Sequence, residues 1–431
     1  MRRLILIAAA AAAALLLGLA LHRSGSAPVV RGSSTEEFST VRRPPSDTQA
    51  TALAAWPTYG YDLARTHVAP VSFRLRPPYR KVWARGLDVW TEFPPSVAYG
   101  NVYAAQLNGV VLAYSARTGV PVWSRSFASH CTDSSPTIAS GVLYQSFVPA
   151  PCDHGDRKKP GLTVAIDART GRVLWRYAGP ASESAPLVRD GILYEGSWDH
   201  SLYALDVRDH RRRLLWRFHA DGELNSSAAY ADGVIYVGSD DGHVYAVDAR
   251  SGRQRWRASG FSHEYFYATP ALAYGRVFIG NTDGTMYAFG AATGHLLWSA
   301  HAGTYVYSAA AVADRTVYVG SYDGNVYAFD AASGATRWKT NLGGAIHGAP
   351  TVMGGLVYFS TCSICADHPS RYVARGPHHT FALDTRSGRI VWRFPDGQYS
   401  PIVSDGKRVY LMGDSVLYGL VPCGSRSSRC R

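Results

Sequence analysis

The stretch VYAVDARSGRQRW, residues 244–256, decides the fold, because related strings recur along the chain. Among them are TVAIDARTGRVLW at 163–175, VYAFDAASGATRW at 326–338 and TFALDTRSGRIVW at 380–392. Each string ends in a tryptophan, most steps between these tryptophans are 40 to 42 residues, and a further tryptophan stands ahead of the first string. Such a period indicates a repeat protein with stacked units. The repeat tryptophans are Trp83, Trp123, Trp175, Trp216, Trp256, Trp298, Trp338 and Trp392.

One repeat unit, residues 228–256, predicts four short strands joined by tight turns. Asp232-Gly233, Asp241-Gly242 and Ser251-Gly252 supply the positive φ that such turns need, and the segments between them alternate in Val, Tyr and Ala. We expect the last strand to end at Trp256. A four-stranded sheet of this size cannot bury both faces alone, so successive sheets must stack around an axis, as in a β-propeller.

The register of the repeats predicts how the ring closes. Complete units end at Trp123 through Trp392, and residues 400–420 add three strands without a tryptophan. The segment YRKVWARG, around Trp83, is expected to supply the missing outer strand. The predicted fold is therefore all-β: an eight-bladed β-propeller with four-stranded blades, in which an N-terminal strand completes the last blade. The alternative of independent hairpins would leave exposed edges at both ends.

The sequence predicts an exported protein. An apolar run at 4–21 follows Met1-Arg2-Arg3 and predicts an N-terminal hydrophobic helix, either a cleaved signal peptide or a membrane anchor. The protein would then face the extracytoplasmic side, tethered by this helix or secreted. The expected segments are 1–23 signal or anchor, 24–55 Ser/Thr/Pro-rich linker, 56–82 propeller lead-in, 83–421 propeller and 422–431 C-terminal tail.

The formal net charge is +12, from 44 Lys and Arg against 32 Asp and Glu among 431 residues. These basic residues are spread along the chain rather than gathered into a stripe, which argues against nucleic-acid binding. A basic surface on a tethered domain suits anionic lipid headgroups instead. We expect a monomer.

The motif Ala-x-Asp-x-x-Thr/Ser-Gly-x-x-x-Trp, at 165–175, 246–256, 328–338 and 382–392, resembles the tryptophan-docking repeat of PQQ-like (pyrroloquinoline-quinone) β-propellers. The segment WPTYGYDLARTHVAP, 56–70, is similar to the lead-in of that superfamily. The resemblance implies that each repeat tryptophan packs between adjacent blades. It also implies that the repeat aspartates bond turn amides; these are Asp167, Asp206, Asp248, Asp330 and Asp384.

The resemblance implies the fold rather than the activity, because the same blade occurs in proteins of different function. These include quinoprotein dehydrogenases, the propeller subunit of the outer-membrane barrel assembly machinery, and extracytoplasmic sensor modules of kinases. The chain resembles the barrel-assembly subunit more than the dehydrogenases.

Residues just ahead of the innermost strands should converge at one mouth of the central channel. Aligning the units places polar side chains at this position in every blade, and we expect them to form a ring that holds water, a cation or a polar ligand. An alternative is a wet channel mouth without a ligand. The ring residues are Glu92, Asp133, Glu183, Asn225, Tyr267, Tyr307, His347 and Gln398.

The dehydrogenases to which the repeat is similar hold calcium and PQQ with Glu, Asn and a catalytic Asp, under a disulfide between adjacent cysteines. Glu183 and Asn225 are of the right type, but Tyr267 and Tyr307 stand where a carboxylate base is wanted, and no Cys-Cys pair occurs. We therefore expect no cofactor, with PQQ and calcium as the alternative.

The six cysteines predict disulfides in an exported chain. The candidates are Cys131, Cys152, Cys362, Cys365, Cys423 and Cys430, with pairings Cys131–Cys152 and Cys423–Cys430 plausible and connectivity open. The alternative for the C-x-x-C pair is a metal site formed by Cys362, Cys365, His368 and His378.

Aromatic side chains gather near the predicted mouth, where they belong either to the core or to a partner-binding patch. The candidates are Trp90, Phe93, Trp198, Tyr265 and Phe266. Together these features predict a non-catalytic scaffold that binds a protein partner or a small polar ligand at the channel mouth. The alternatives are a PQQ- and calcium-dependent dehydrogenase and a ligand-sensing propeller.

Overall fold

The computed structural model describes residues 38–39, 54–89, 91–151, 159–210, 212–363, 365, 374, 376, 378–399 and 401–423. These residues form β-strands and one 3-10 turn, η1 (Arg208–His210). Among them there is no helix long and apolar enough to cross a membrane. The predicted hydrophobic helix at 4–21 lies outside the described residues, as do most of the linker and most of the C-terminal tail.

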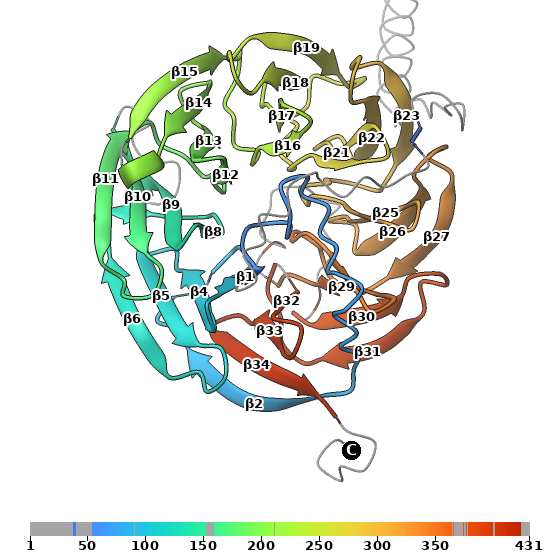
Figure 1. Ribbon diagram of the computed structural model, residues 1–431. Helices are drawn as coiled ribbons and strands as arrows, with labels where there is room; N and C mark the ends of the chain where they lie inside the picture. Colours follow the sequence, from blue (N-terminus) through green and yellow to red (C-terminus); the bar gives the residue numbers. More distant parts are fainter. Residues whose placement is uncertain are drawn as a thin grey trace, which may run out of the picture.

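The strands form eight antiparallel sheets around a central axis, which confirms the eight-bladed propeller (Figure 1). In blades 1 to 7 the four strands run from the axis outward in chain order, whereas in blade 8 the outermost strand comes from the N-terminal part of the chain. Blades 1 to 4 consist of β3 (Ser96–Ala98), β4 (Asn101–Ala105), β5 (Val110–Ser115) and β6 (Pro121–Ser126); β8 (Thr137–Ala139), β9 (Val142–Pro149), β10 (Gly161–Asp167) and β11 (Val173–Gly179); β12 (Leu187–Arg189), β13 (Ile192–Gly196), β14 (Ser201–Asp206) and β15 (Arg213–His219); β16 (Ala229–Ala231), β17 (Val234–Gly238), β18 (His243–Asp248) and β19 (Gln254–Ser259).

The remaining blades follow the same plan. Blades 5 to 8 consist of β20 (Ala271–Ala273), β21 (Arg276–Gly280), β22 (Thr285–Gly290) and β23 (Leu296–His301); β24 (Ala311–Ala313), β25 (Thr316–Gly320), β26 (Asn325–Asp330) and β27 (Thr336–Asn341); β28 (Thr351–Met353), β29 (Leu356–Ser360), β30 (Thr380–Asp384) and β31 (Ile390–Phe394); β32 (Ile402–Ser404), β33 (Val409–Met412), β34 (Val416–Pro422) and β2 (Tyr79–Gly86). β1 (Ala54–Trp56) adds a fifth strand to blade 1, and β7 (His130–Cys131) adds one to blade 2.

The ring closes as the repeat register predicts. β2 pairs antiparallel with β34, and Trp83 lies opposite Gly419. The N-terminal strand therefore completes the last blade as its outermost strand.

The prediction that outer strands end at the repeat tryptophan is wrong. β19 continues three residues beyond Trp256, to Ser259 opposite His243. The tryptophan is thus mid-strand, where its indole can reach across to the next blade.

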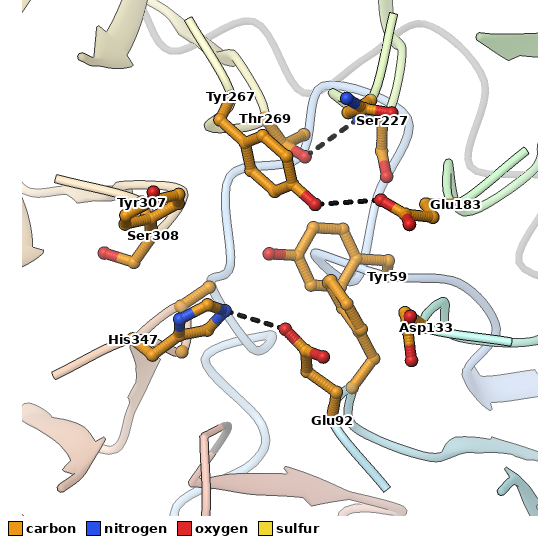
Figure 2. Close-up of a pocket in the computed structure, with 14 residues that line it drawn as sticks. Tyr59, Glu92, Asp133, Glu183, Ser227, Tyr267, Thr269, Tyr307, Ser308 and His347 are labelled. Atoms are coloured by element: carbon orange, nitrogen blue, oxygen red, sulfur yellow. Dashed lines mark hydrogen bonds and ion pairs between the residues drawn. The ribbon is translucent and has the colours of Figure 1, made fainter. Parts of the chain in front are cut away.

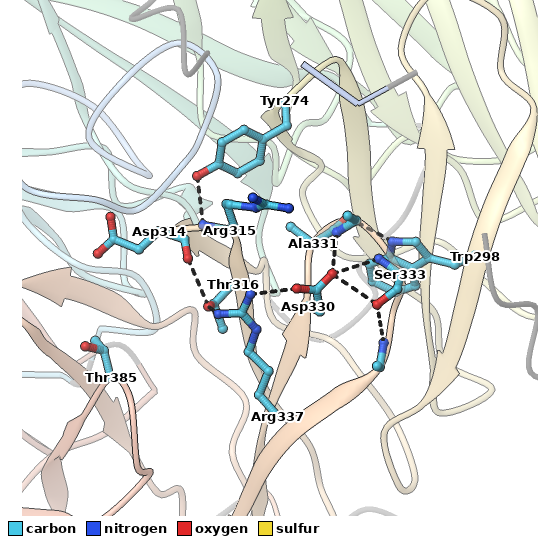
Figure 3. Close-up of polar contacts among 12 residues, drawn as sticks. Tyr274, Trp298, Asp314, Arg315, Thr316, Asp330, Ala331, Ser333, Arg337 and Thr385 are labelled. Atoms are coloured by element: carbon cyan, nitrogen blue, oxygen red, sulfur yellow. Dashed lines mark hydrogen bonds and ion pairs between the residues drawn. The ribbon is translucent and has the colours of Figure 1, made fainter. Parts of the chain in front are cut away.

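Six of the repeat tryptophans donate an indole hydrogen bond to a carbonyl of the next blade, as Figure 3 shows for blades 5 and 6. Nε1 of Trp298 donates to the carbonyl of Ala331 at 3.0 Å, and the indole lies against Gly334, where an added Cβ would come within 2.8 Å of the ring. The Asp330 carboxylate accepts the Ser333 amide in the same turn. Equivalent indole bonds join Trp83 to Ala116, Trp123 to Ala168, Trp216 to Ala249, Trp256 to Ala291 and Trp338 to Thr385.

The repeat aspartates bond turn amides, as the resemblance implies. The amides that they accept are those of Thr170 at Asp167, Arg208 at Asp206, Ser251 at Asp248, Ser333 at Asp330 and Ser387 at Asp384. The core is divided accordingly into clusters that fill the spaces between neighbouring blades. One such cluster joins Tyr236 and Trp256 of blade 4 to Ile279 and Phe289 of blade 5.

The lead-in runs inside the channel of the propeller (Figure 1). Its sequence alone does not predict this position. Its carbonyls accept amides from the innermost strands of several blades. These bonds join Pro57 to Ile138, Leu63 to Tyr230, Ala64 to Leu272, Thr66 to Val312 and His67 to Val352, at 2.7 to 3.0 Å. Residues 57–67 therefore plug the channel.

Candidate functional site

A small cavity lies at one mouth of the channel (Figure 2). It is lined by residues from seven blade-entry loops and from the lead-in. The lining residues are Tyr59, Glu92, Phe93, Asp133, Glu183, Asn225, Ser227, Tyr267, Thr269, Tyr307, Ser308, His347, Gly348 and Ala349.

The structure brings together seven of the eight residues predicted for the ring: Glu92, Asp133, Glu183, Asn225, Tyr267, Tyr307 and His347. Each lies in the loop that connects the outer strand of one blade with the inner strand of the next, so the circular stacking points them at one axis. Gln398, the residue of blade 8, does not line the cavity and is fully buried. Ligand binding by the ring stays a prediction.

The cavity is acidic. Burial raises the pKa of Asp133 well above its ordinary 3.8, and the charges of Glu92 and Glu183 raise it further. Oδ1 of Asp133 is buried and has no hydrogen-bond partner among the described residues. The site thus holds carboxylates that repel one another in a poorly solvated space.

Tyrosines form much of the cavity wall. The Tyr267 hydroxyl donates to Oε2 of Glu183 at 2.9 Å, and burial together with this carboxylate raises the pKa of Tyr267. The ring of Tyr307 meets Tyr267 edge to face, with centroids 5.4 Å apart. Tyr307 also stacks on His347 with centroids at 5.5 Å. The cavity therefore presents aromatic surface beside its carboxylates.

His347 links two polar groups across the mouth. Its Nε2 lies 2.8 Å from Oε1 of Glu92, and its Nδ1 lies 2.5 Å from the Tyr322 hydroxyl. The same imidazole packs edge to face on Tyr399, at 4.9 Å between centroids. Tyr399 follows the buried Gln398 in the chain, so His347 contacts the entry segment of blade 8 as well as Glu92.

Asn225 faces the neighbouring hairpin of its own blade. Its Nδ2 donates to Oδ2 of Asp240 at 2.8 Å and to Glu223 at 3.3 Å. Its amide nitrogen is therefore engaged by acidic side chains rather than directed at a ligand.

The floor of the cavity comes from the lead-in, which sequence reasoning missed as a site element. Tyr59 lies at the centre of the view in Figure 2 and is almost fully buried. Behind it, Arg65 is completely buried and donates to the carbonyls of Tyr59, Ala185 and Ala228, among others. The lead-in sequence contains an arginine and tyrosines that could have suggested a site. Because the lead-in has no repeat periodicity, however, its sequence did not predict that these residues lie in the channel.

The predicted partner-binding aromatics separate into different environments. Tyr265 is 49% exposed, and Phe93 lines the cavity. Trp198 and Phe266 are buried, which agrees with the core alternative for these two residues. Trp198 packs with Cys131 and Val148, and Phe266 packs within the core between blades 4 and 5. Trp90 lies outside the described residues.

The disulfide prediction is confirmed for the C-x-x-C pair, since Cys362 and Cys365 are bonded to each other. This bond contradicts the alternative metal site, because both thiols are consumed; of its histidines, His378 lies 3.8 Å from Asp396 and His368 is outside the described residues. Cys131 and Cys423 each take part in a disulfide as well. Their suggested partners, Cys152 and Cys430, lie outside the described residues.

The cavity does not fit PQQ, which carries three carboxylates. The described residues that line it include Glu92, Asp133 and Glu183 but no Lys or Arg, so an anionic quinone would meet repulsion. Nor do the described residues contain a group of three or more His, Cys, Asp or Glu placed to hold a metal ion.

Fold and repeat together define the class: an eight-bladed propeller of the PQQ-like type, with its channel plugged by its own lead-in. The family model described as PQQ_2, outer membrane protein assembly factor BamB, matches residues 156–213, 210–306 and 302–422. These matches span more than half of the chain, and the chain belongs to this family.

Individual relatives are distant. A segment of 127 residues is 28% identical to the outer membrane protein assembly factor BamB of Shewanella oneidensis and covers 28% of this chain and 31% of that protein. The match thus spans about a third of that relative's length.

Solved structures share the fold. BamB from Moraxella catarrhalis superposes with a TM-score of 0.64 at 17% identity, covering 81% of this chain and 99% of that one. The quinohemoprotein alcohol dehydrogenase ADHIIG from Pseudomonas putida HK5 gives a TM-score of 0.67 at 14% identity, covering 86% and 81%. The likeness reaches both a BamB and an enzyme, so it does not distinguish between their functions.

Proposed function

We propose that this protein is an extracytoplasmic, non-catalytic propeller that binds a partner protein at the mouth of its channel. The observation that carries the proposal is the mouth itself: a half-open cavity closed from below by Tyr59 and bordered by an exposed aromatic loop. In that loop, which enters blade 5, Phe261 is 44% and Tyr265 is 49% exposed. Membership of the BamB-type family supports a protein-binding role.

The chemistry of the cavity favours binding over the dehydrogenase alternative. The lining residues offer no cationic partner for PQQ, and the Tyr267 hydroxyl is held by Glu183 rather than poised as a base. A binding surface needs no such base, and exposed aromatic side chains next to a pocket are typical of protein contacts.

Site-specific photocrosslinking in cells tests the proposal. A photoreactive residue replaces Tyr265 at the mouth or, as the control, Arg250, which is exposed in the β18–β19 turn on the opposite face. We expect a discrete adduct of defined mass from position 265 and none from position 250. Equal adducts from both positions, or none from position 265, would contradict binding at the mouth.

Calorimetric titration of PQQ with Ca²⁺, run beside a dye-linked dehydrogenase assay, separates the two functions. We expect neither saturable binding nor turnover of alcohols or sugars. Turnover would move the protein to the quinoprotein enzymes and make Glu183 and Asn225 the first residues to mutate.

A further inference from the structure

We propose that the mouth cavity binds an organic ammonium group, either the head of a small amine or a lysine side chain. This inference rests on the proposed function, because it names the chemistry that the same mouth would recognise. It joins two properties of the cavity lining: three carboxylates with no Lys or Arg among the described lining residues, and aromatic walls.

The lining of the cavity is acidic, whereas the chain as a whole has a positive net charge. The chain carries a formal net charge of +12, yet its described cavity-lining residues include three carboxylates, one histidine and no Lys or Arg. His347 is engaged with Glu92. A cation entering the cavity would therefore meet an attractive field that the protein surface as a whole does not provide.

Arg65, the buried cation behind the floor, does not neutralise this charge. Its guanidinium donates to the Thr58 hydroxyl and to main-chain carbonyls of Tyr59, Ala185, Pro186 and Ala228. These acceptors are uncharged, so these hydrogen bonds of Arg65 hold the plug together and none of them goes to a cavity carboxylate.

Two side chains of the cavity lining each have a buried oxygen without a hydrogen-bond partner among the described residues. Oδ1 of Asp133 is buried and accepts no hydrogen bond from any described residue. Ser308 also lines the cavity, is 2% exposed, and its hydroxyl has no partner in the described part of the chain. Buried polar atoms are normally paired, so these two oxygens leave the hydrogen bonding of the cavity lining incomplete.

The aromatic walls favour an organic cation over a metal ion. Tyr59, Phe93, Tyr267 and Tyr307 line the same space, and the faces of such rings attract ammonium groups. A metal ion would instead need several ligands converging on one point, and the described residues contain no such group. An alkylammonium uses the dispersed carboxylates and the rings together.

Calorimetry on the full chain tests this chemistry with choline and its uncharged isostere dimethylbutanol. A second arm compares a short neutral peptide that carries one lysine with the same peptide carrying norleucine. We expect choline to bind saturably and dimethylbutanol to bind at least tenfold more weakly. Preference for the lysine peptide over choline assigns the ammonium to a protein partner, and the reverse assigns it to a small amine.

Variants locate the binding. Asp133→Asn and Glu183→Gln preserve shape and remove charge, and each should weaken choline binding about tenfold or more. The matched control is Asp221→Asn, in the loop entering blade 4, where the carboxylate is 75% exposed and does not line the cavity. It should leave affinity unchanged, and unfolding curves confirm that all variants are folded.

Three results would overturn the inference: equal binding of choline and dimethylbutanol, full affinity in both cavity variants, or no heat with any cation. Photocrosslinking from Tyr265 keeps this outcome separate from the proposed function. A crosslinked partner without cation binding leaves the scaffold role standing and rejects the ammonium site. Cation binding without a crosslink leaves a small-cation site and rejects the protein partner.

Discussion

Nε2 of His347 lies 2.8 Å from Oε1 of Glu92, which joins the entry loops of blades 7 and 1 across the sector of blade 8. Both side chains are less than one-fifth exposed, so the contact is largely sheltered from solvent. The other imidazole nitrogen lies 2.5 Å from the Tyr322 hydroxyl. One side chain thus connects polar groups from three blades at the mouth.

Replacing this histidine should destabilise the propeller. In His347→Ala, Glu92 and Tyr322 lose a shared partner in a poorly solvated place, and we expect the free energy of unfolding to fall by about 1–3 kcal/mol. Urea denaturation measures the change. His263→Ala, at an exposed position on the same face, is the control and should be near neutral. Equal stability of His347→Ala and the wild type would show that the contact contributes nothing.

Removing the Asp133 charge should stabilise the protein, and the gain should depend on pH. The pKa of Asp133 is raised in the folded state by burial and by Glu92 and Glu183, so its favourable contribution is complete below 3.8. That contribution is lost as the pH rises through the higher folded-state pKa. The other titratable groups lining this space are Tyr59, Tyr267, Tyr307 and His347.

Asp133→Asn should therefore melt above the wild type at neutral pH, and the two melting temperatures should converge as the pH falls toward 4. Thermal unfolding followed by circular dichroism across this range checks the sign. A difference that grows as the pH falls would contradict the raised pKa.

Removing the Arg65 guanidinium should weaken the channel plug. Arg65→Met leaves several buried carbonyl acceptors without a donor, and we expect a loss of about 2–4 kcal/mol in the free energy of unfolding. Limited proteolysis should then cut within 57–69, where the wild type resists. Arg74→Met, at an exposed position of the same lead-in, should change neither measurement.

Two glycines separate backbone strain from the tryptophan contact. Gly334 and Gly355 have similar positive φ, +73° and +78°, but an added Cβ meets the Trp298 ring at 2.8 Å from Gly334 and meets nothing within 4 Å from Gly355. Gly355→Ala should cost about 1 kcal/mol for the left-handed backbone. Gly334→Ala should cost about 1–3 kcal/mol more, because the indole must shift. Equal losses in urea denaturation would show that the indole is not confined.

Local sequence determined the blade, the blade number and the closure. Turn residues such as Asp241-Gly242 and the repeat tryptophan act within one unit or between adjacent units, so their spacing carries the architecture. The convergence of Glu92, Asp133, Glu183, Tyr267 and His347 was also predictable, because equivalent positions of stacked repeats meet at the axis. The strand ends were not, since Trp256 gives no sign that β19 runs on to Ser259.

Only the tertiary structure decided what fills the axis. Tyr59 and Arg65 lie in a lead-in without periodicity, and their partners, such as Ala228, are more than a hundred residues away. The burial of three further side chains likewise depends on neighbouring loops rather than on the repeat: Trp198, Phe266 and Gln398. Gln398 lies in the sector where His347 contacts Glu92. A repeat fixes positions relative to its own unit, whereas exposure and pairing at the mouth depend on segments that the repeat does not contain.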